Sequence, residues 1–236
     1  MPPIYYVYIA ILLVAVLSVI VSIMVNSKFK KYSQVYLHSG LTAEQIVKKI
    51  TTQGGAHVNI SRVAGHLSDH YDPRDNTVYL SDSTSGSSSV SAIGVAAHEA
   101  GHALKENQGY LFLKLRSWLV PVVNFSSRWA IFIILIGFLF SGVLIDSVAG
   151  ATVGDIILTI GIVMYSLVTL FTLITLPVEF NASRRAIRAL GDYMDDEELR
   201  GVKTVLTCAA LTYVVSFAGS LLQLLRIIMI FGRRRR

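Results

Sequence analysis

The run His98-Glu99-Ala100-Gly101-His102 contains the side chains best suited to metal chemistry. Apolar residues recur around it at helical spacing and no proline interrupts them, so residues 90–106 are predicted to form a helix. Histidines four positions apart then lie on one face, one above the other, and both can reach one zinc ion. Glu99 falls beside that face, where it can take a proton from zinc-bound water instead of binding the metal.

A surface helix with two solvated histidines is the alternative interpretation of this motif. The residues around the motif are small and apolar, which suits a helix held tightly against other elements; they are Ala96, Ala97, Ala100, Gly101 and Ala103. The flanking residues are also apolar, so the helix is predicted to be mostly buried. These features favour a zinc site over a solvated pair.

A glutamate further along the chain can complete the site. A catalytic zinc usually keeps three protein ligands and one open position, and two histidines with a glutamate form one of the standard sets. Glu179 is predicted to begin a cytoplasmic helix that continues to Leu190, on the same side of the membrane as the histidines. Asn181, Ser183 and Arg184 lie within about a turn of it and can orient a ligand. Alternatively, Glu179 only complements the dipole of a helix N-terminus.

The polar part of the chain is predicted to hold a helix, a hairpin and a linker before the histidine motif. Thr42 and Gln45 form a capping box that opens the helix, and Gly54-Gly55 ends it. Strands are predicted at residues 58–60, 65–71 and 77–81, with a turn at 72–76 that joins the last two into a hairpin. The last serines of the Ser/Gly linker 83–89 can cap the motif helix.

Three polar residues of the hairpin, His66, Asp69 and His70, could approach the zinc, or they could simply decorate its surface. The hairpin matters because extended peptide substrates commonly bind by adding a strand to an exposed sheet edge. His38 and His57 have no partner pattern and are predicted to lie on the surface.

The composition indicates a membrane protein. Of the 236 residues, 53% are hydrophobic and 15% are charged, and the mean hydropathy is +0.57. Basic residues cluster beside apolar stretches, so the net charge of +6 reports membrane orientation and does not indicate nucleic-acid binding. The single cysteine, Cys208, can form no intramolecular disulfide and excludes a cysteine-based zinc cluster.

The first apolar stretch, residues 4–25, is long enough to cross a bilayer. A signal peptide is the alternative, but no basic region precedes the stretch and no Ala-x-Ala-like site follows it. An uncleaved anchor is therefore predicted. Lys28, Lys30 and Lys31 place its end in the cytoplasm.

Further apolar stretches follow the histidine motif. An interfacial segment at residues 114–128 leads into a membrane hairpin formed by 129–145 and 156–176. Residues 204–225 could span the membrane, lie partly in its interface, or pack over the zinc site with Tyr213 facing inward. A fourth crossing would leave the terminal arginines outside, against the positive-inside tendency. Before this stretch, the carboxylates of Asp195 to Glu198 could bind a cation, but the favoured prediction is that these residues cap the start of a helix.

The fold expected from these features is a mainly α integral membrane protein with a small α+β, zincin-like catalytic domain and about four membrane-associated apolar helices. Its expected segments are an N-terminal transmembrane anchor (1–27), a cytosolic catalytic part (28–117), an interfacial segment with a transmembrane hairpin (118–178), a third-ligand helix with an acidic loop (179–203), and a C-terminal apolar helix with a basic tail (204–236).

Three segments together carry a family resemblance: His98 to Ala103, Asp69 to Pro73, and Leu176 to Ser183. They resemble the YugP-like neutral zinc metallopeptidases of bacteria over nearly the whole chain, and are similar to the HtpX and CAAX prenyl protease group of membrane gluzincins. The resemblance implies zinc ligation by His98, His102 and Glu179, with Glu99 as general base. The chain departs from the Glu-x-x-Ala-Asp pattern of the HtpX-like enzymes, because Ser183 stands where they carry aspartate.

The function expected is that of a zinc-dependent endopeptidase with one zinc ion, anchored as a multi-pass protein in a bacterial inner membrane, with its site on the cytoplasmic side. Expected partners are peptide or protein substrates, including membrane proteins, and the bilayer. Arg184, Arg185, Tyr193 and Tyr213 are candidates to stabilise the oxyanion.

Three other functions are weighed against this one. A non-catalytic membrane protein with a structural or interface zinc is the main rival, but such a site needs no base and usually fills the fourth position. A transporter or channel is disfavoured because the apolar stretches hold few buried charges. The intramembrane site-two proteases need the histidine motif inside a spanning helix and a later Leu-Asp-Gly aspartate, and this chain has neither feature.

Overall fold

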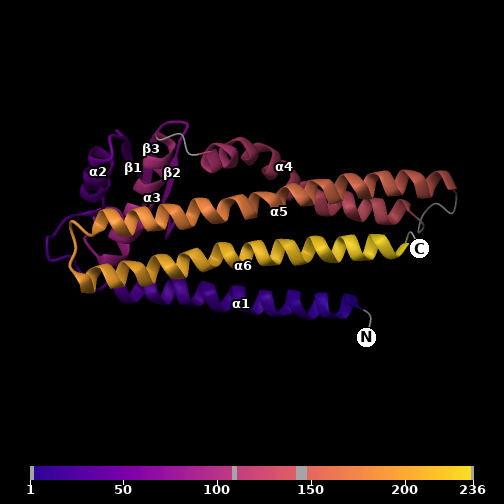
Figure 1. Cartoon of the computed structure of the whole chain (residues 1–236), viewed down its shortest axis with the longest axis horizontal. Coiled ribbons are helices and arrows are strands. Elements are labelled where there is room, and N and C mark those ends of the chain that lie inside the picture. The colour runs from indigo at the N-terminus through magenta and orange to yellow at the C-terminus, as the bar shows by residue number, and fades with distance from the viewer. Residues whose placement is uncertain (1–2, 108–110, 142–147, 235–236) are drawn as a thin grey trace. The chain divides into compact units, whose positions relative to one another are not determined.

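The computed structural model describes the chain apart from residues 1–2, 108–110, 142–147 and 235–236 (Figure 1). The described residues form six helices and a small sheet: α1 (Pro3–Tyr32), α2 (Ala43–Gln53), β1 (Asn59–Val63), β2 (His70–Asp72), β3 (Thr77–Ser81), α3 (Val90–Asn107), α4 (Leu111–Phe140), α5 (Val148–Leu190) and α6 (Asp196–Arg234). The predicted class, mostly helical with four long apolar helices, is confirmed.

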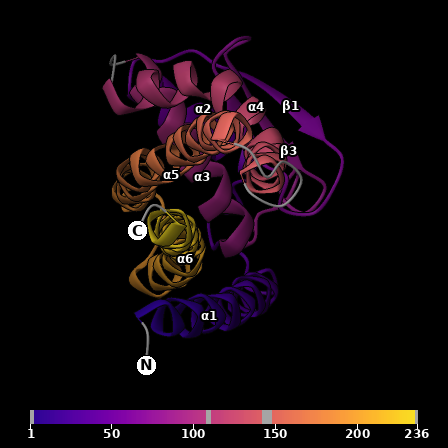
Figure 2. The ribbon, with the colours of Figure 1, turned by 90° about the vertical axis from the view of Figure 1, so that its right-hand side faces the viewer.

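The chain divides into two compact units. The first comprises residues 1–18, 115–175 and 214–236, and the second comprises residues 19–114 and 176–213. Within the first unit, α6 lies between α1 and α5 in both views (Figure 1, Figure 2). The second unit holds the sheet, α2, α3 and the ends of the long helices.

Among the described residues, four helices are long and apolar enough to cross a membrane: Ile4–Tyr32, Lys114–Phe140, Thr152–Leu190 and Asp196–Gly232. The expected interfacial segment at residues 114–128 is no separate element, because α4 continues through it with Pro121 inside the helix. A proline removes one backbone hydrogen bond and kinks a helix, but long apolar helices tolerate this change.

The predicted boundary at Glu179 is wrong, since α5 runs without interruption from Val148 to Leu190. Pro177 stands inside it, so only one N–H is missing from the helical ladder and the helix continues on both sides. Glu179 therefore lies far from the N-terminus of its helix, which removes the interpretation that it complements the dipole there.

The sheet has the strand order β1-β3-β2. β2 pairs antiparallel with β3, which confirms the predicted hairpin, and β1 pairs parallel with β3 on its other side. β3 is therefore the central strand, and the hairpin presents only the three residues of β2 to a free edge. Each of β1 and β2 forms one edge of this sheet.

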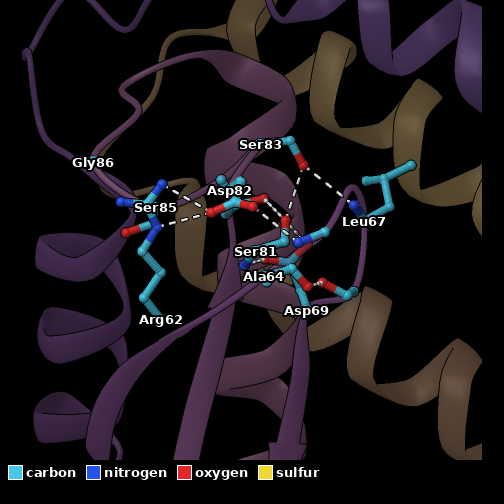
Figure 3. A network of polar contacts seen from close by, with 12 residues as sticks. Arg62, Ala64, Leu67, Asp69, Ser81, Asp82, Ser83, Ser85 and Gly86 are labelled. Carbon is cyan, nitrogen blue, oxygen red and sulfur yellow. Dashed lines mark hydrogen bonds and ion pairs between the residues drawn. The ribbon is translucent and has the colours of Figure 1, made fainter.

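The expected strand at residues 65–71 is shorter than predicted, because a loop takes its first half. Gly65 and Leu67 have φ values of +116° and +54°, which are incompatible with an extended strand. The Asp82 carboxylate accepts from the Gly65 N–H at 2.9 Å, and the Ser83 hydroxyl accepts from the Leu67 N–H at 3.2 Å (Figure 3). These bonds hold the loop beside the end of β3.

α2 begins and ends where the sequence predicts. The Thr42 N–H donates to Oε1 of Gln45 at 2.9 Å, and the Gly54 N–H donates to the carbonyl of Ile50 at 3.1 Å. The apolar face of α2 is buried in the core of the second unit against α3; its residues are Ala43, Ile46, Val47 and Ile50.

The serine-rich linker before α3 is held by hydrogen bonds along its length. The Glu44 carboxylate accepts from the Ser85 hydroxyl at 2.9 Å and from the Gly86 N–H at 2.8 Å. At its end, the Ala92 N–H donates a long hydrogen bond of 3.4 Å to the Ser89 hydroxyl, which is the predicted N-cap. The start of α3 is therefore held by its own N-cap and by the linker, which is bonded to α2.

Candidate metal centre

The two motif histidines lie side by side on one face of α3. Their rings are 4.7 Å apart between centroids and nearly perpendicular, at 86°. The Nε2 atoms of His98 and His102 are 3.1 Å apart. Both side chains are largely buried, with 13% and 8% of their surface exposed. Helical spacing thus brings two ring nitrogens to a single point, as the sequence predicts.

Glu179 approaches the same point from α5. Its Oε2 lies 3.1 Å from Nε2 of His98 and 3.6 Å from Nε2 of His102. The Glu179 side chain is 2% exposed. Residues 81 positions apart in the sequence are therefore brought together by the packing of α3 against α5.

The spacing of these three atoms fits a tetrahedral zinc ion. Zinc bonds to histidine nitrogen and carboxylate oxygen are about 2.0–2.2 Å long, so two ligand atoms at a tetrahedral angle lie about 3.3–3.5 Å apart. The three observed separations are 3.1, 3.1 and 3.6 Å. Two imidazoles and a carboxylate are also a donor set that zinc commonly takes. Geometry and chemistry both suit this metal.

A glycine allows α3 and α5 to approach so closely. A Cβ atom added to Gly101 would lie 2.9 Å from the carbonyl oxygen of Ala182 on α5. Ala182 itself is fully buried, as are Ala97 and Ala100 of the motif helix. Gly101 is thus the point of close contact between α3 and α5, in agreement with the prediction that small residues hold α3 tightly against a neighbouring element.

Ser183 supports one histidine from behind. Its hydroxyl oxygen lies 3.1 Å from Nδ1 of His98, the ring nitrogen remote from the other two ligand atoms. An Nδ1–H donated to this hydroxyl leaves the lone pair of Nε2 directed at the metal position. His102 differs, because its Nδ1 is buried with no hydrogen-bond partner in the part of the chain that the structure describes.

Glu99 lies next to His98 on α3 but outside the converging group. Its side chain is buried, with 8% exposed, and it makes no hydrogen bond or ion pair among the described residues. A carboxylate without such partners keeps its oxygens available for another group at the site.

The candidate residues in and beside the hairpin have local partners other than His98, His102 and Glu179. Asp69 accepts from the N–H and the hydroxyl of Ser81, both at 2.7 Å (Figure 3). His70 stacks on Tyr79 with ring centroids 4.8 Å apart, and His66 contacts Phe29 edge to face. Asp69 thus fastens the loop before β2 to β3, and its carboxylate is used by that contact.

The remaining candidates lie on α5, α6 and the turn between them. Asn181 is half-buried and Arg184 is exposed, both on α5, while Tyr213 is half-buried on α6. Tyr193 packs at the edge of the core, with Nζ of Lys49 5.6 Å from its ring centroid.

Lys105 is a buried charge that the sequence analysis missed. It lies one turn beyond His102 on α3 and is 1% exposed. Burial, with a smaller contribution from the charge of Arg185, lowers the pKa of Lys105 to about 8. The signal was its position three residues after His102, which places it on the same helix face.

His38 is exposed as predicted, but the expectation that it lacks partners is wrong. Its Nδ1 lies 2.9 Å from Oε1 of Glu198 and 3.2 Å from Oδ2 of Asp195. Asp195 also accepts the N–H groups of Glu197 and Glu198, which confirms the predicted cap of α6. These contacts join the segment after α1 to the start of α6, through residues far apart in the sequence.

Comparison with known proteins places this centre in a family. A family model described as "putative neutral zinc metallopeptidase" matches residues 7–232. The chain belongs to this family. It is also 41% identical over 210 residues to "Putative membrane protease YugP" of Bacillus subtilis (strain 168), an alignment that covers 88% of each protein. No solved structure gives a significant match. The predicted resemblance is confirmed, and with four apolar helices the chain is a membrane protein.

Proposed function

We propose that this chain is a zinc-dependent endopeptidase of the gluzincin type, with a zincin-like catalytic domain built on α3, α5 and the sheet. The observation that carries the proposal is the convergence of His98, His102 and Glu179 at separations that suit one tetrahedral zinc. Three protein ligands leave a fourth position open, which distinguishes a catalytic site from a closed structural one.

When bound, zinc would act as a Lewis acid that polarises the scissile carbonyl and activates a water molecule. Glu99 is the general base: it accepts a proton from the water as the carbon–oxygen bond forms. Glu99 then gives this proton to the amine as the carbon–nitrogen bond breaks. Its burial beside a ligand, without a hydrogen-bonding partner among the described residues, supports this role.

The residues behind the ligands orient them. The Ser183 hydroxyl accepts a hydrogen bond from the Nδ1–H of His98. This hydrogen bond selects the tautomer of His98 that binds metal through Nε2. A neutral hydroxyl stabilises the imidazole less than a carboxylate would, so we expect His98 to be a weaker ligand than it would be with an aspartate at position 183.

The active site is proposed to face the cytoplasm from a bacterial inner membrane. Lys28, Lys30 and Lys31 at the end of α1 support this orientation through the positive-inside tendency. Substrates would be extended segments of proteins, including the tails of membrane proteins, paired with a free edge of the sheet. β2 contacts α3, so this short edge is the one nearest the motif helix.

The deciding experiment compares purified wild type with Glu99→Gln in detergent, with zinc content and cleavage of an unstructured protein measured for both. We expect about one zinc per chain in each protein and cleavage only by the wild type, at least about a hundredfold faster than by the variant. Glu197→Gln, at an exposed glutamate at the start of α6, is the matched control and should cleave normally.

Two outcomes would contradict the proposal. Equal cleavage by wild type and Glu99→Gln would exclude Glu99 as the base. Normal zinc content with a biological activity that survives Glu99→Gln would instead favour the rival, a structural zinc without catalysis.

A further inference from the structure

Arg226 is a charged residue within the apolar part of α6. Uncharged residues 204–225 precede it and uncharged residues 227–232 follow it. The side chain is half-buried in the first unit, where α6 lies between α1 and α5 (Figure 1, Figure 2). Ionisable residues in membrane segments are rare and normally mark a site where a partner is bound.

Two aromatic side chains without formal charge lie close to Arg226. Its Cζ lies 5.7 Å from the ring centroid of Tyr8 on α1, a cation–π contact. Tyr165 on α5 is close enough to interact with it electrostatically. Nε of Arg226 is buried and has no hydrogen-bond partner among the described residues. The ion pairs that the described residues form do not include Arg226 either.

The position of Tyr8 indicates the depth of this arginine in the bilayer. Tyr5, Tyr6 and Tyr8 are 54%, 63% and 43% exposed on the first turns of α1, and exposed tyrosines gather at the level of the lipid headgroups. Lys28 follows Tyr8 by twenty residues, about 30 Å of helix. This length equals the thickness of the hydrocarbon core. Arg226 therefore lies near the headgroup edge of one leaflet, at the N-terminal end of α1.

We propose that Arg226, together with Tyr8 and Tyr165, binds the phosphate of an anionic phospholipid. Phosphate oxygens can accept paired hydrogen bonds from a guanidinium, including the Nε–H that has no acceptor among the described residues. The acyl chains would lie along the exposed apolar face of α1 below Tyr8, where Leu12 and Leu13 are 65% and 58% exposed.

The charge of the site selects the class of lipid. No carboxylate among the described residues pairs with Arg226, so the site has a net positive charge. An anionic headgroup neutralises this charge, whereas a zwitterionic headgroup brings its own cation beside the guanidinium. A preference for phosphatidylglycerol over phosphatidylcholine follows. This site is separate from the metal centre and does not depend on the proposed peptidase activity.

The test uses the full chain in mild detergent and counts bound lipid by native mass spectrometry, with phosphatidylglycerol and phosphatidylcholine of identical chains. We expect the wild type to bind one phosphatidylglycerol at least about tenfold more tightly than phosphatidylcholine, a difference of one strong charge-assisted contact. Arg226→Gln should abolish the preference and Arg226→Lys should keep part of it. Arg200→Gln makes the same chemical change at an exposed position on α6 and should leave the preference intact.

A second variant protects the test against misfolding. Tyr8→Leu keeps the arginine but removes the ring beneath it, and should weaken phosphatidylglycerol binding several-fold. Zinc content should stay normal in every variant. An undiminished preference in both Arg226→Gln and Tyr8→Leu would overturn the proposal. Thermal stabilisation by inorganic phosphate equal to that by phosphatidylglycerol would also overturn it, because the lipid would then not be required.

Discussion

Histidine and carboxylate groups converge at two places among the described residues of the second unit, and the surroundings of the two groups differ. In the α3–α5 group the side chains of His98 and Glu179 are 13% and 2% exposed. In the group at the start of α6 the side chains of His38 and Asp195 are 84% and 49% exposed, and only that of Glu198, at 5%, is buried. The interatomic distances are similar, at 3.1–3.6 Å and 2.9–3.2 Å. Distance alone therefore does not identify a metal centre.

The other atoms of each carboxylate show what distinguishes the two groups. At the start of α6, Oδ1 of Asp195 accepts two backbone N–H groups, and Oε2 of Glu198 accepts the N–H of Asp195. These carboxylates already stabilise a helix terminus, and water can replace their contact with His38. In the α3–α5 group the donors are buried between two helices, where an unpaired charge would be costly. A bound cation would neutralise this buried charge and so stabilise the folded protein.

The largest expected effect is the loss of zinc from the buried group alone. Glu179→Gln replaces a charged ligand by a neutral amide, so zinc content should fall from about one per chain to near zero, and cleavage should be lost with it. Glu198→Gln makes the same change at a buried glutamate of the group at the start of α6 and should leave both zinc content and cleavage unchanged. Metal analysis after dialysis measures the effect. Full zinc occupancy in Glu179→Gln would remove Glu179 from the ligand set.

A change in helix packing should damage the buried group without touching a ligand. Gly101→Ala places a methyl group 2.9 Å from the Ala182 carbonyl, and such overpacking typically costs about 1–3 kcal/mol. The helices must separate, so zinc affinity should fall together with the free energy of unfolding. Gly219→Ala is the matched control, because its added Cβ would meet Val14 at an ordinary 3.6 Å. A Gly101→Ala protein with normal stability and zinc binding would show that the close approach is dispensable.

A smaller effect is expected from the residue behind His98. Ser183→Ala removes the acceptor 3.1 Å from Nδ1, and loss of such a partner usually weakens metal binding about tenfold or more. Ser183→Asp should strengthen it, since a carboxylate holds the imidazole more firmly than a hydroxyl does. Competition with a zinc chelator measures both affinities. Equal affinities in the three proteins would mean that Ser183 does not orient His98.

The smallest expected effect concerns Asp195, in the group at the start of α6, and depends on pH. The N–H of Glu198 donates to Asp195 and is the main cause that lowers the pKa of this carboxyl below its ordinary value. A lowered pKa in the folded state gives stability that is full above the ordinary pKa and is lost as pH falls through the folded one. We therefore measure the melting temperature between pH 3 and pH 7. Asp195→Asn should reduce the fall in melting temperature at the acidic end of this range. It should leave zinc content at neutral pH unaltered, and a loss of zinc would contradict a purely structural role.

Local patterns in the sequence were enough to predict several features. The spacing of His98 and His102, the capping pair of Thr42 and Gln45, and the acidic cap of α6 each depend on residues within one helical turn. Glu179 was also predicted, because two histidines and a glutamate form a standard zinc-binding set and the apolar stretches return the chain to the side of the histidines. The lone apolar stretches likewise marked the long helices.

Features that depend on tertiary contacts were predicted less well. The pairing of β1 with β3 was not predicted, because parallel pairing joins strands that no local sequence pattern connects. Leu67 interrupts the expected strand because it adopts a positive φ. The side chains of Asp82 and Ser83, which come from beyond the hairpin, hold this loop by hydrogen bonds. The partners of His38 come from 157 and 160 residues away. The predicted helix start at Glu179 is wrong, because α5 continues through Pro177.

The uninterrupted course of α5 has a mechanical consequence for the metal centre. Glu179, Ala182 and Ser183 supply the third ligand atom, the surface against Gly101 and the support for His98. All three lie within five consecutive positions of one rigid rod. Turning that rod by the 100° of a single residue would withdraw them together. The three contributions are therefore made or lost together, and the position of α5 decides whether the metal centre is assembled.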